Sequence, residues 1–327
     1  MENTPHPLAS PPWVAGGAKS RAVTRWSLLA KIVVSAALLY YLSLKIEWHN
    51  VSERLAAAAP GPLLAAVALL IVSLFAAALR WRLLVQQGGA RMSMSLAVQW
   101  TYAGQFFGQV LPATIGGDVV RGVLAHRSGL PWRDVVTGVV LDRVAALLGS
   151  VILIFTGLPL LAERAAGESL SLAWTVLVSL ALIIGLGVAL SLDRLPLPLS
   201  LTERPFVANV LGLARRLRHG LRSRAGFVGL ALSLLIHLNT VVIVVVIGRG
   251  LCVEISPLAA FLVVPLAILA AAVPISLNGW GVREGVMVTG FGLFGIPAGD
   301  ALLVSVTLGL AVVVSVLPGS FTWLTSK

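Results

Sequence analysis

Two short stretches, 162 residues apart, share one pattern that sets the expectation for the fold. The first reads Pro-Ala-Thr-Ile-Gly-Gly-Asp-Val-Val-Arg over residues 112–121, and the second reads Pro-Ile-Ser-Leu-Asn-Gly-Trp-Gly-Val-Arg over residues 274–283. Proline ends a helix because it lacks an N–H and clashes with the preceding turn. The hydroxyl residue and the glycines that follow allow a tight turn before a new helix begins. The pattern therefore predicts a broken helix in each half of the chain.

The two stretches lie in a strongly apolar chain. Of its 327 residues, 58% are hydrophobic and only 11% are charged, against about 25% charged residues in an ordinary soluble domain. This composition excludes a soluble enzyme, a disordered chain and a nucleic-acid-binding domain, so we expect no nucleic-acid partner despite the net charge of +11. The single cysteine excludes an internal disulfide and a multi-cysteine metal site. We expect neither a metal nor a cofactor.

Apolar segments long enough to span a bilayer recur along the chain. A span needs about 20 largely apolar residues, and six segments meet that requirement: 27–44, 61–79, 135–161, 169–192, 225–248 and 300–321. The segments 92–117 and 255–282 are also uncharged, but they are polar and interrupted by proline and glycine. We expect them to be re-entrant or broken helices, which are tolerated where the backbone is buried in protein or lines a cavity. The predicted fold class is an all-α polytopic membrane protein with about six full spans and two re-entrant segments, or about eight spans by hydropathy alone.

The positions of the basic residues favour this topology over eight full spans. If both broken segments return to the side they came from, seventeen lysines and arginines fall on the cytoplasmic side and five on the other. A full crossing by 92–117 would move the loop 193–224, with its seven arginines, to the outside, against the positive-inside rule. We expect an inner (cytoplasmic) membrane protein with a cytoplasmic, disordered N-terminus over residues 1–26. A cleavable signal peptide is the alternative for that segment.

The halves of the chain match in organisation as well as in motif. Each half has two spans, then a broken segment, then one more span. Three crossings per half is an odd number, so the halves have opposite orientations, as in the inverted repeats of many secondary transporters. The predicted organisation is residues 1–26 as a tail, 27–163 as the first repeat and 164–327 as the second, both within one integral membrane domain.

The restarted helices suggest a site for an anion. Backbone N–H groups and the helix dipole favour negative charge at a helix N-terminus, and an arginine one turn further can bind a phosphate through two parallel hydrogen bonds. Arg121 and Arg283 occupy these positions, and Arg283 lies on the side that is poor in basic residues. The remaining candidates for substrate binding are the turn residues and the neighbouring charges: Gly116, Gly117, Asp118, Asp142, Arg143, Asn278, Gly279 and Glu284. The structural alternative is that proline and glycine merely shape membrane helices and that Arg121 is one more topology signal.

Other polar residues have less specific interpretations. Asp142 and Arg143 lie within one span and, being adjacent on a helix, face different directions, so each is expected to pair across helices, Arg121 and Glu284 being possible partners. His237 lies mid-span and fits either a proton relay or a hydrogen-bonded packing residue. Arg80-Trp81-Arg82 closes the second span and is expected to anchor it at the interface. The basic amphipathic stretch 205–224 is expected to lie on the anionic cytoplasmic leaflet, or else to be a topology-setting loop.

In these residues the chain resembles the transmembrane region of the lysylphosphatidylglycerol synthases, a family also described as flippase-like. The resemblance covers about residues 25–325 and lies in the order of several blocks: 80–82, 104–107, 111–112, 116–121, 142–143 and 276–285. Bifunctional members join such a region to a soluble aminoacyl transferase domain, and the membrane region moves the aminoacylated phosphatidylglycerol outward. This sequence ends at Lys327 without that domain, so the lysyl-lipid substrate is not implied. Stand-alone relatives are associated with polyprenyl-phosphate sugar carriers or hopanoid pathways.

Together the residues and the resemblance imply a lipid flippase or scramblase, and not an enzyme. The substrate would be a lipid with an anionic or phosphate-bearing headgroup: an aminoacyl-phospholipid, a polyprenyl phosphate or a hopanoid-related lipid. One alternative is a non-transporting membrane partner of a separate lipid-synthesising or glycosyl-transferring enzyme. Another, a membrane enzyme acting on a lipid phosphate, is less favoured because the sequence offers no nucleophile–histidine pair or metal cluster.

Overall fold

The computed structural model describes residues 32–44, 48–110, 116–164, 192–194, 204–273 and 275–321, with scattered positions between 177 and 191. These residues form helices and turns and include no strand, so the predicted all-α class is confirmed. Residues 1–26, most of the predicted span 169–192, and the prolines at 112 and 274 lie outside the described residues.

Four helices of the described chain are long and apolar enough to cross a bilayer. They are α3 (Pro60–Val85), α6 (Trp132–Arg164), α10 (Arg224–Gly250) and α13 (Ala298–Val316), and they confirm four of the six predicted spans. The first predicted span is described from its sixth residue as the shorter apolar helix Ile32–Ser43. At a rise of 1.5 Å per residue, α3 and α6 are longer than the roughly 30 Å hydrocarbon core, so they can cross it while tilted.

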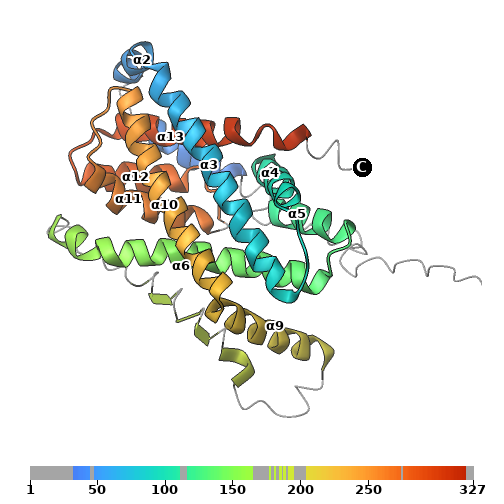
Figure 1. Ribbon diagram of the computed structural model, residues 1–327. Helices are drawn as coiled ribbons and strands as arrows, with labels where there is room; N and C mark the ends of the chain where they lie inside the picture. The colour runs from blue at the N-terminus through green and yellow to red at the C-terminus, as the bar shows by residue number, and fades with distance from the viewer. Residues whose placement is uncertain are drawn as a thin grey trace, which may run out of the picture.

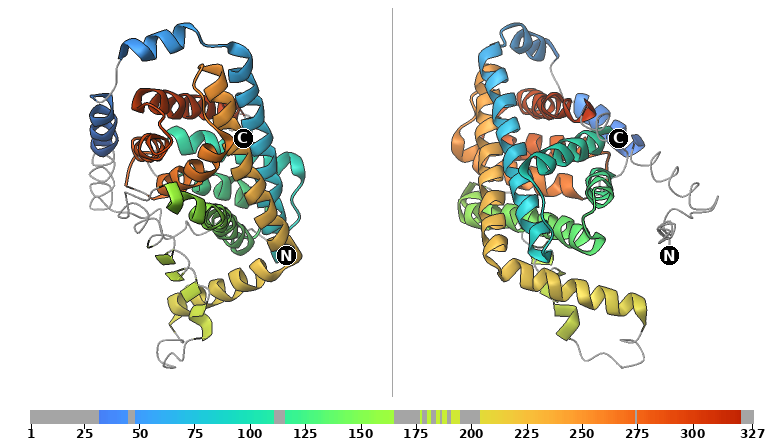
Figure 2. Two further views of the ribbon diagram at one scale, coloured as in Figure 1. Left: turned by 90° about the vertical axis from the view of Figure 1, so that its left-hand side faces the viewer. Right: turned by 45° about the vertical axis from the view of Figure 1, so that its right-hand side comes forward.

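The helices α3 and α10 run antiparallel along the length of the molecule (Figure 1). Asn239 on α10 donates hydrogen bonds to the carbonyl of Leu69, at 2.9 Å, and to the hydroxyl of Ser73, at 2.8 Å. In Figures 1 and 2, α6 crosses the lower half of this pair and α13 the upper half, both steeply inclined to it. The short helix α2 (Trp48–Ala56) lies at the upper end and α9 (Pro205–Arg222) at the lower end. Short 3-10 turns, η1 (Gln86–Gly88) and η2 (Leu192–Arg194), complete the described elements.

The first broken segment is a helix hairpin made of α4 (Met94–Val110) and α5 (Gly116–Arg127). It starts beside the end of α3, where Arg82 donates a 2.7 Å hydrogen bond to the Met92 carbonyl. Its two helices touch through glycines: a Cβ on Gly117 would lie 2.1 Å from the carbonyl oxygen of Gly104. Such backbone-to-backbone packing is typical of membrane helices with small residues at their interface, and it holds α5 against α4.

The second broken segment is a hairpin of α11 (Pro257–Ala272) and α12 (Val282–Gly292). It starts at the opposite end of the molecule, just after the end of α10. Its turn uses left-handed backbone conformations, with φ of 48° at Asn278, 81° at Gly279 and 87° at Gly281. Glycine adopts these angles at little cost, and asparagine tolerates them better than most residues. The pattern of the second stretch is therefore explained by the turn that it makes.

The two hairpins enter from opposite ends of the α3–α10 pair, and the turn of the second meets the end of α4 in the first. Asn278 in the second turn donates a 2.6 Å hydrogen bond through its Nδ2 to the Oε1 of Gln109, near the end of α4. The second tip also contacts the first helix, because the backbone N–H of Leu277 donates to the Ser35 hydroxyl at 2.8 Å. Both segments therefore fold back, as predicted, and the turn of the second lies within hydrogen-bond distance of the end of α4 in the first, 169 residues earlier.

Two apolar clusters hold these elements in place. One joins α10 to α11, α12 and α13 around fully buried side chains: Ile243, Val244, Ile247, Val263, Met287, Phe291 and Val304. The other joins α3 to the first hairpin and the start of α6: Trp81, Val85, Met92, Ala97, Trp100, Ala125 and Val135. Each hairpin thus packs on its own cluster.

Adding a methyl group at the glycine contact should loosen the first hairpin. In Gly117→Ala the new Cβ would overlap the Gly104 carbonyl, and overpacking of this kind costs about 1–3 kcal/mol. We expect a lower thermal unfolding midpoint of the purified protein in detergent. Gly285→Ala, on α12, is the matched control because its Cβ would meet nothing within 4 Å, so its midpoint should stay the same or rise slightly. Equal midpoints for the two variants would contradict the tight contact.

Candidate functional site

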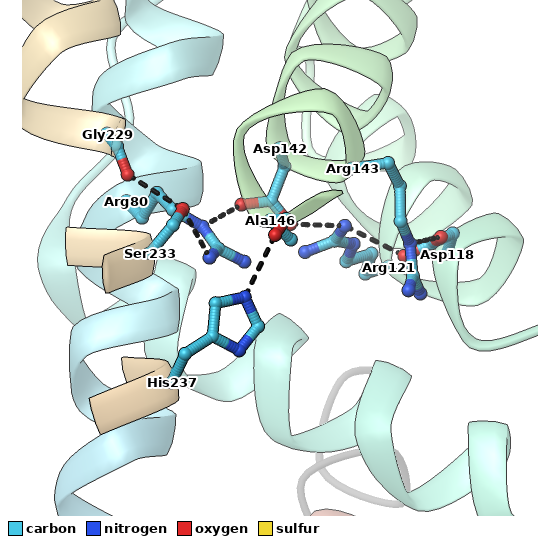
Figure 3. A network of polar contacts seen from close by, with 9 residues as sticks. All are labelled: Arg80, Asp118, Arg121, Asp142, Arg143, Ala146, Gly229, Ser233 and His237. Atoms are coloured by element: carbon cyan, nitrogen blue, oxygen red, sulfur yellow. Dashed lines mark hydrogen bonds and ion pairs between the residues drawn. The ribbon is translucent and has the colours of Figure 1, made fainter. Parts of the chain in front are cut away.

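A chain of ion pairs buried between four helices forms the candidate site (Figure 3). At its centre, the carboxylate of Asp142 on α6 accepts a 2.6 Å hydrogen bond from Arg80 Nε on α3. Its other oxygen accepts a 2.8 Å bond from Arg121 on α5. Arg80 also donates to the Ser233 hydroxyl on α10 at 2.9 Å. One carboxylate thus ties α6 to the first hairpin and, through Arg80, to the α3–α10 pair.

The chain continues along the first hairpin. Arg121 also contacts Asp118, one turn earlier on α5, at 2.7 Å. Asp118 in turn accepts a 2.5 Å hydrogen bond from Arg143 Nε on α6. The guanidinium of Arg121 lies over the ring of Trp81, with 5.0 Å between Cζ and the ring centroid, an arrangement that favours a cation. We call the five charged residues of this chain the arginine–aspartate network: Arg80, Asp118, Arg121, Asp142 and Arg143.

Burial and charge set this network apart. The side chains of Arg80, Asp118, Arg121 and Asp142 are each less than a tenth exposed, whereas that of Arg143 is 54% exposed. Three guanidinium groups face two carboxylates, so the network carries one excess positive charge. Ionisable groups inside membrane proteins are costly, and they are therefore functional candidates. The excess charge would be neutralised by one anion, and Arg143 is the member that such an anion can reach.

A second, smaller cluster lies at the start of α12. The Glu284 carboxylate is fully buried, and its Oε1 accepts hydrogen bonds from Arg283 Nε at 3.0 Å and from the Ser305 hydroxyl at 3.3 Å. Its Oε2 accepts a 2.6 Å bond from the backbone N–H of Gly281. The Arg283 guanidinium stacks on the ring of Trp280, 4.9 Å from its centroid. This cluster has one positive and one negative group and no excess charge.

Small residues bring the surrounding helices close to the network. A Cβ on Gly149 of α6 would lie 2.9 Å from the Ser233 Cβ on α10. His237, one turn beyond Ser233, bonds through Nε2 to the Ala146 carbonyl at 2.8 Å (Figure 3). This is the contact expected of a hydrogen-bonded packing residue. It accounts for the position of His237 without a proton relay.

The structure brings together some of the predicted site residues and separates others. Asp118, Arg121, Asp142 and Arg143 share one network, and the predicted pairing of Asp142 with Arg121 is found. Gly116 and Gly117 start the helix that carries two of them. Asn278, Gly279, Arg283 and Glu284 lie in the second tip or just after it. Glu284 pairs with Arg283, and among the described residues it does not pair with Arg143, which bonds Asp118.

One expectation from the sequence is wrong. Arg80 and Trp81 cannot anchor α3 to lipid headgroups, because α3 continues to Val85 and the protein buries both side chains. At the start of α12, the N–H of Gly281 donates to the Glu284 carboxylate. The sequence analysis missed Ser233 and Arg80 as members of the network. The position of Arg80, immediately after the predicted span 61–79, was a usable signal.

Long apolar helices, two helix hairpins that meet at their tips, and a buried network of ion pairs define a polytopic integral membrane protein. Residues 28–319 match the model of the family described as the lysylphosphatidylglycerol synthase TM region. The chain belongs to this family, as the resemblance in the motif blocks indicated. No protein with curated annotation matches the chain significantly.

Removing the Asp142 carboxylate should destabilise the protein strongly. Asp142→Asn leaves Arg80 and Arg121 without their shared counter-charge, and loss of one partner of a buried ion pair costs about 3–5 kcal/mol. We expect a large fall in the thermal unfolding midpoint in detergent. Glu53→Gln is the control, because Glu53 contacts only the exposed His49 among the described residues and such pairs contribute little.

A double-mutant cycle separates the ion pair from unrelated damage. Arg80→Met combined with Asp142→Asn removes one charge of each sign, so the double variant should lose less stability than the two single variants together. Additive losses would show that Arg80 and Asp142 do not stabilise each other.

Proposed function

We propose that the protein moves a lipid with an anionic or phosphate-bearing headgroup between the two leaflets, as a flippase or scramblase. Aminoacyl-phospholipids, polyprenyl phosphates and hopanoid-related lipids are the candidate substrates, since the family implies a membrane-lipid function. In this proposal the residues 27–163 and 164–327 act as opposed repeats of one transport domain and do not catalyse a reaction. We place the domain in the cytoplasmic membrane with its N-terminus in the cytoplasm, in keeping with the positive-inside count.

The excess positive charge of the arginine–aspartate network carries this proposal. The buried members balance, two arginines against two aspartates, so the excess charge falls on Arg143, whose side chain is 54% exposed. One phosphate charge would remove the imbalance. Arg143 is half exposed and uses its Nε to bond Asp118, which leaves its terminal nitrogens able to bind a headgroup oxygen.

The contact between the hairpin tips supports a route for the headgroup. In secondary transporters, broken helices that meet near the bilayer midplane form the substrate site, and their movement gives alternating access. Here Gln109 and Asn278 join the tips through one side-chain hydrogen bond, which a polar headgroup can replace at little net cost. We propose that the headgroup passes these tips while its acyl chains stay in the bilayer, with Arg143 and Arg121 on one side and Arg283 on the other.

A neutral substitution at Arg143 tests the proposal without unfolding the protein. In Arg143→Gln the buried ion pairs of Arg80, Arg121 and Asp142 remain. Loss of a charge-assisted hydrogen bond to phosphate, worth about 1.5–3 kcal/mol, should slow the movement of a labelled anionic phospholipid in reconstituted vesicles about tenfold or more. Arg127→Gln, on the same hairpin but outside the network, is the matched control and should transport normally.

The outcomes of this assay discriminate between functions. Equal rates for Arg143→Gln, Arg127→Gln and the wild type would refute the role of Arg143. Purified wild-type protein that leaves the labelled lipid in its original leaflet would refute the flippase proposal, and would favour a non-transporting partner of a separate lipid-modifying enzyme.

A further inference from the structure

The helix α9 has an apolar stripe that is only half covered by the rest of the protein. Its second half packs on the bundle through Ala214, Leu217 and Gly220, all buried, and Leu217 contacts Leu84 and Leu141. The same stripe continues back along the helix through Leu213 and Val210 to Phe206, at spacings of three or four residues. Phe206 is 79% exposed. The stripe therefore runs beyond the edge of the bundle with no described protein on it.

The direction of this stripe is fixed by the packing of its covered half. Leu217 points toward the bundle. Phe206 and Val210 lie on the same side of the helix, so they point in the same direction, away from the outer end of the molecule. Figures 1 and 2 show α9 lying across that end, beneath the lower ends of α3 and α10. A side chain that faces this way and is not covered by protein reaches the lipid beside the spans.

The opposite side of α9 is strongly basic. Arg215, Arg218 and Arg222 lie on this side of the helix. Counted with their neighbours, the described residues 192–194 and 204–224 contain seven arginines and one acidic residue, Asp193. Asp193 accepts a 2.7 Å hydrogen bond from Arg218, which lowers the pKa of the carboxyl and keeps it charged. It also faces Arg215 at 3.6 Å, whose side chain is 72% exposed. One carboxylate cannot balance this many guanidinium groups, so the surface carries a net positive charge that attracts anions.

We propose that α9 is an interfacial helix embedded in an anionic leaflet, with Phe206 among the acyl chains and the arginine side bound to phospholipid headgroups. Apolar and basic residues on opposite sides are the pattern of helices that lie in the membrane interface, and each arginine near an anionic surface contributes about 1 kcal/mol of attraction. The partner is the lipid surface itself. This assignment holds whether or not the protein moves lipid.

The anchoring of α9 also bears on the arginine–aspartate network. Leu141, against which α9 packs, directly precedes Asp142 on α6, and Arg216 of α9 donates a 3.2 Å hydrogen bond to the Thr137 hydroxyl one turn earlier. The helix held by the lipid surface is thus the one that supports the start of α6. Anionic lipid on α9 therefore stabilises the segment of α6 that positions the central carboxylate.

Fluorescent labels on the two sides of α9 test the proposal in the full chain. Cys252 is the single cysteine, so Cys252→Ser gives a background for Phe206→Cys or Ala208→Cys. These two positions are both exposed and lie about 200° apart on the helix. In phosphatidylcholine–phosphatidylglycerol vesicles, acyl-brominated lipids should quench a label at position 206 and spare one at 208, which aqueous iodide should quench instead.

The same label tests the preference for anionic lipid. At position 206, brominated phosphatidylglycerol should quench more strongly than brominated phosphatidylcholine at equal mole fraction. Arg215→Gln with Arg222→Gln should lower this preference by up to about fivefold per arginine, while Arg215→Lys with Arg222→Lys should retain it. Equal quenching at 206 and 208, or a label at 206 shielded from bromine and iodide alike, would overturn the insertion. An equal effect of the two brominated lipids would overturn the anionic leaflet.

Discussion

The arrangement of the bundle depends on one carboxylate in an apolar environment. Asp142 binds Arg80 and Arg121 at once, and so connects the α3–α10 pair to α6 and to the first hairpin. In water such a pair contributes little, but inside a membrane neither partner can be left alone. The helices that carry these residues must therefore stay together, and the steep crossing of α6 over α3 and α10 is the geometry that lets all three side chains meet.

The main features of the fold could be read from the sequence because each rests on local chemistry. Apolar length predicts the four described spans, and proline with glycine predicts the breaks in 92–117 and 255–282. The distribution of arginines predicts that both broken segments turn back. The same residue types explain the left-handed turn at 278–281. None of these inferences needs a partner from another part of the chain.

The site was harder to predict because its contacts join distant residues. Hydropathy ends the second span at residue 79, so Arg80 seemed to belong to the interface, whereas α3 continues for more than another turn and buries it. Nothing local identifies Ser233 as its neighbour, since 153 residues separate them. The pairing of Asp118 with Arg143 likewise depends on how α5 packs against α6. Residue type identified four of the five network members, but tertiary packing alone determines which arginine pairs with which aspartate.

The two halves of the chain share a motif in their sequence and differ in the charge of the residues around it. In the second half, Glu284 accepts hydrogen bonds from Arg283 and from the Gly281 N–H, so this cluster is neutral. In the first half, three guanidinium groups face two carboxylates, which leaves one positive charge in excess. The half-exposed Arg143 lies at the edge of this network. An anion approaching the meeting point of the hairpins therefore gains more from the first half than from the second. In the proposed transport, this difference in charge would let a headgroup bind more strongly beside the first hairpin than beside the second.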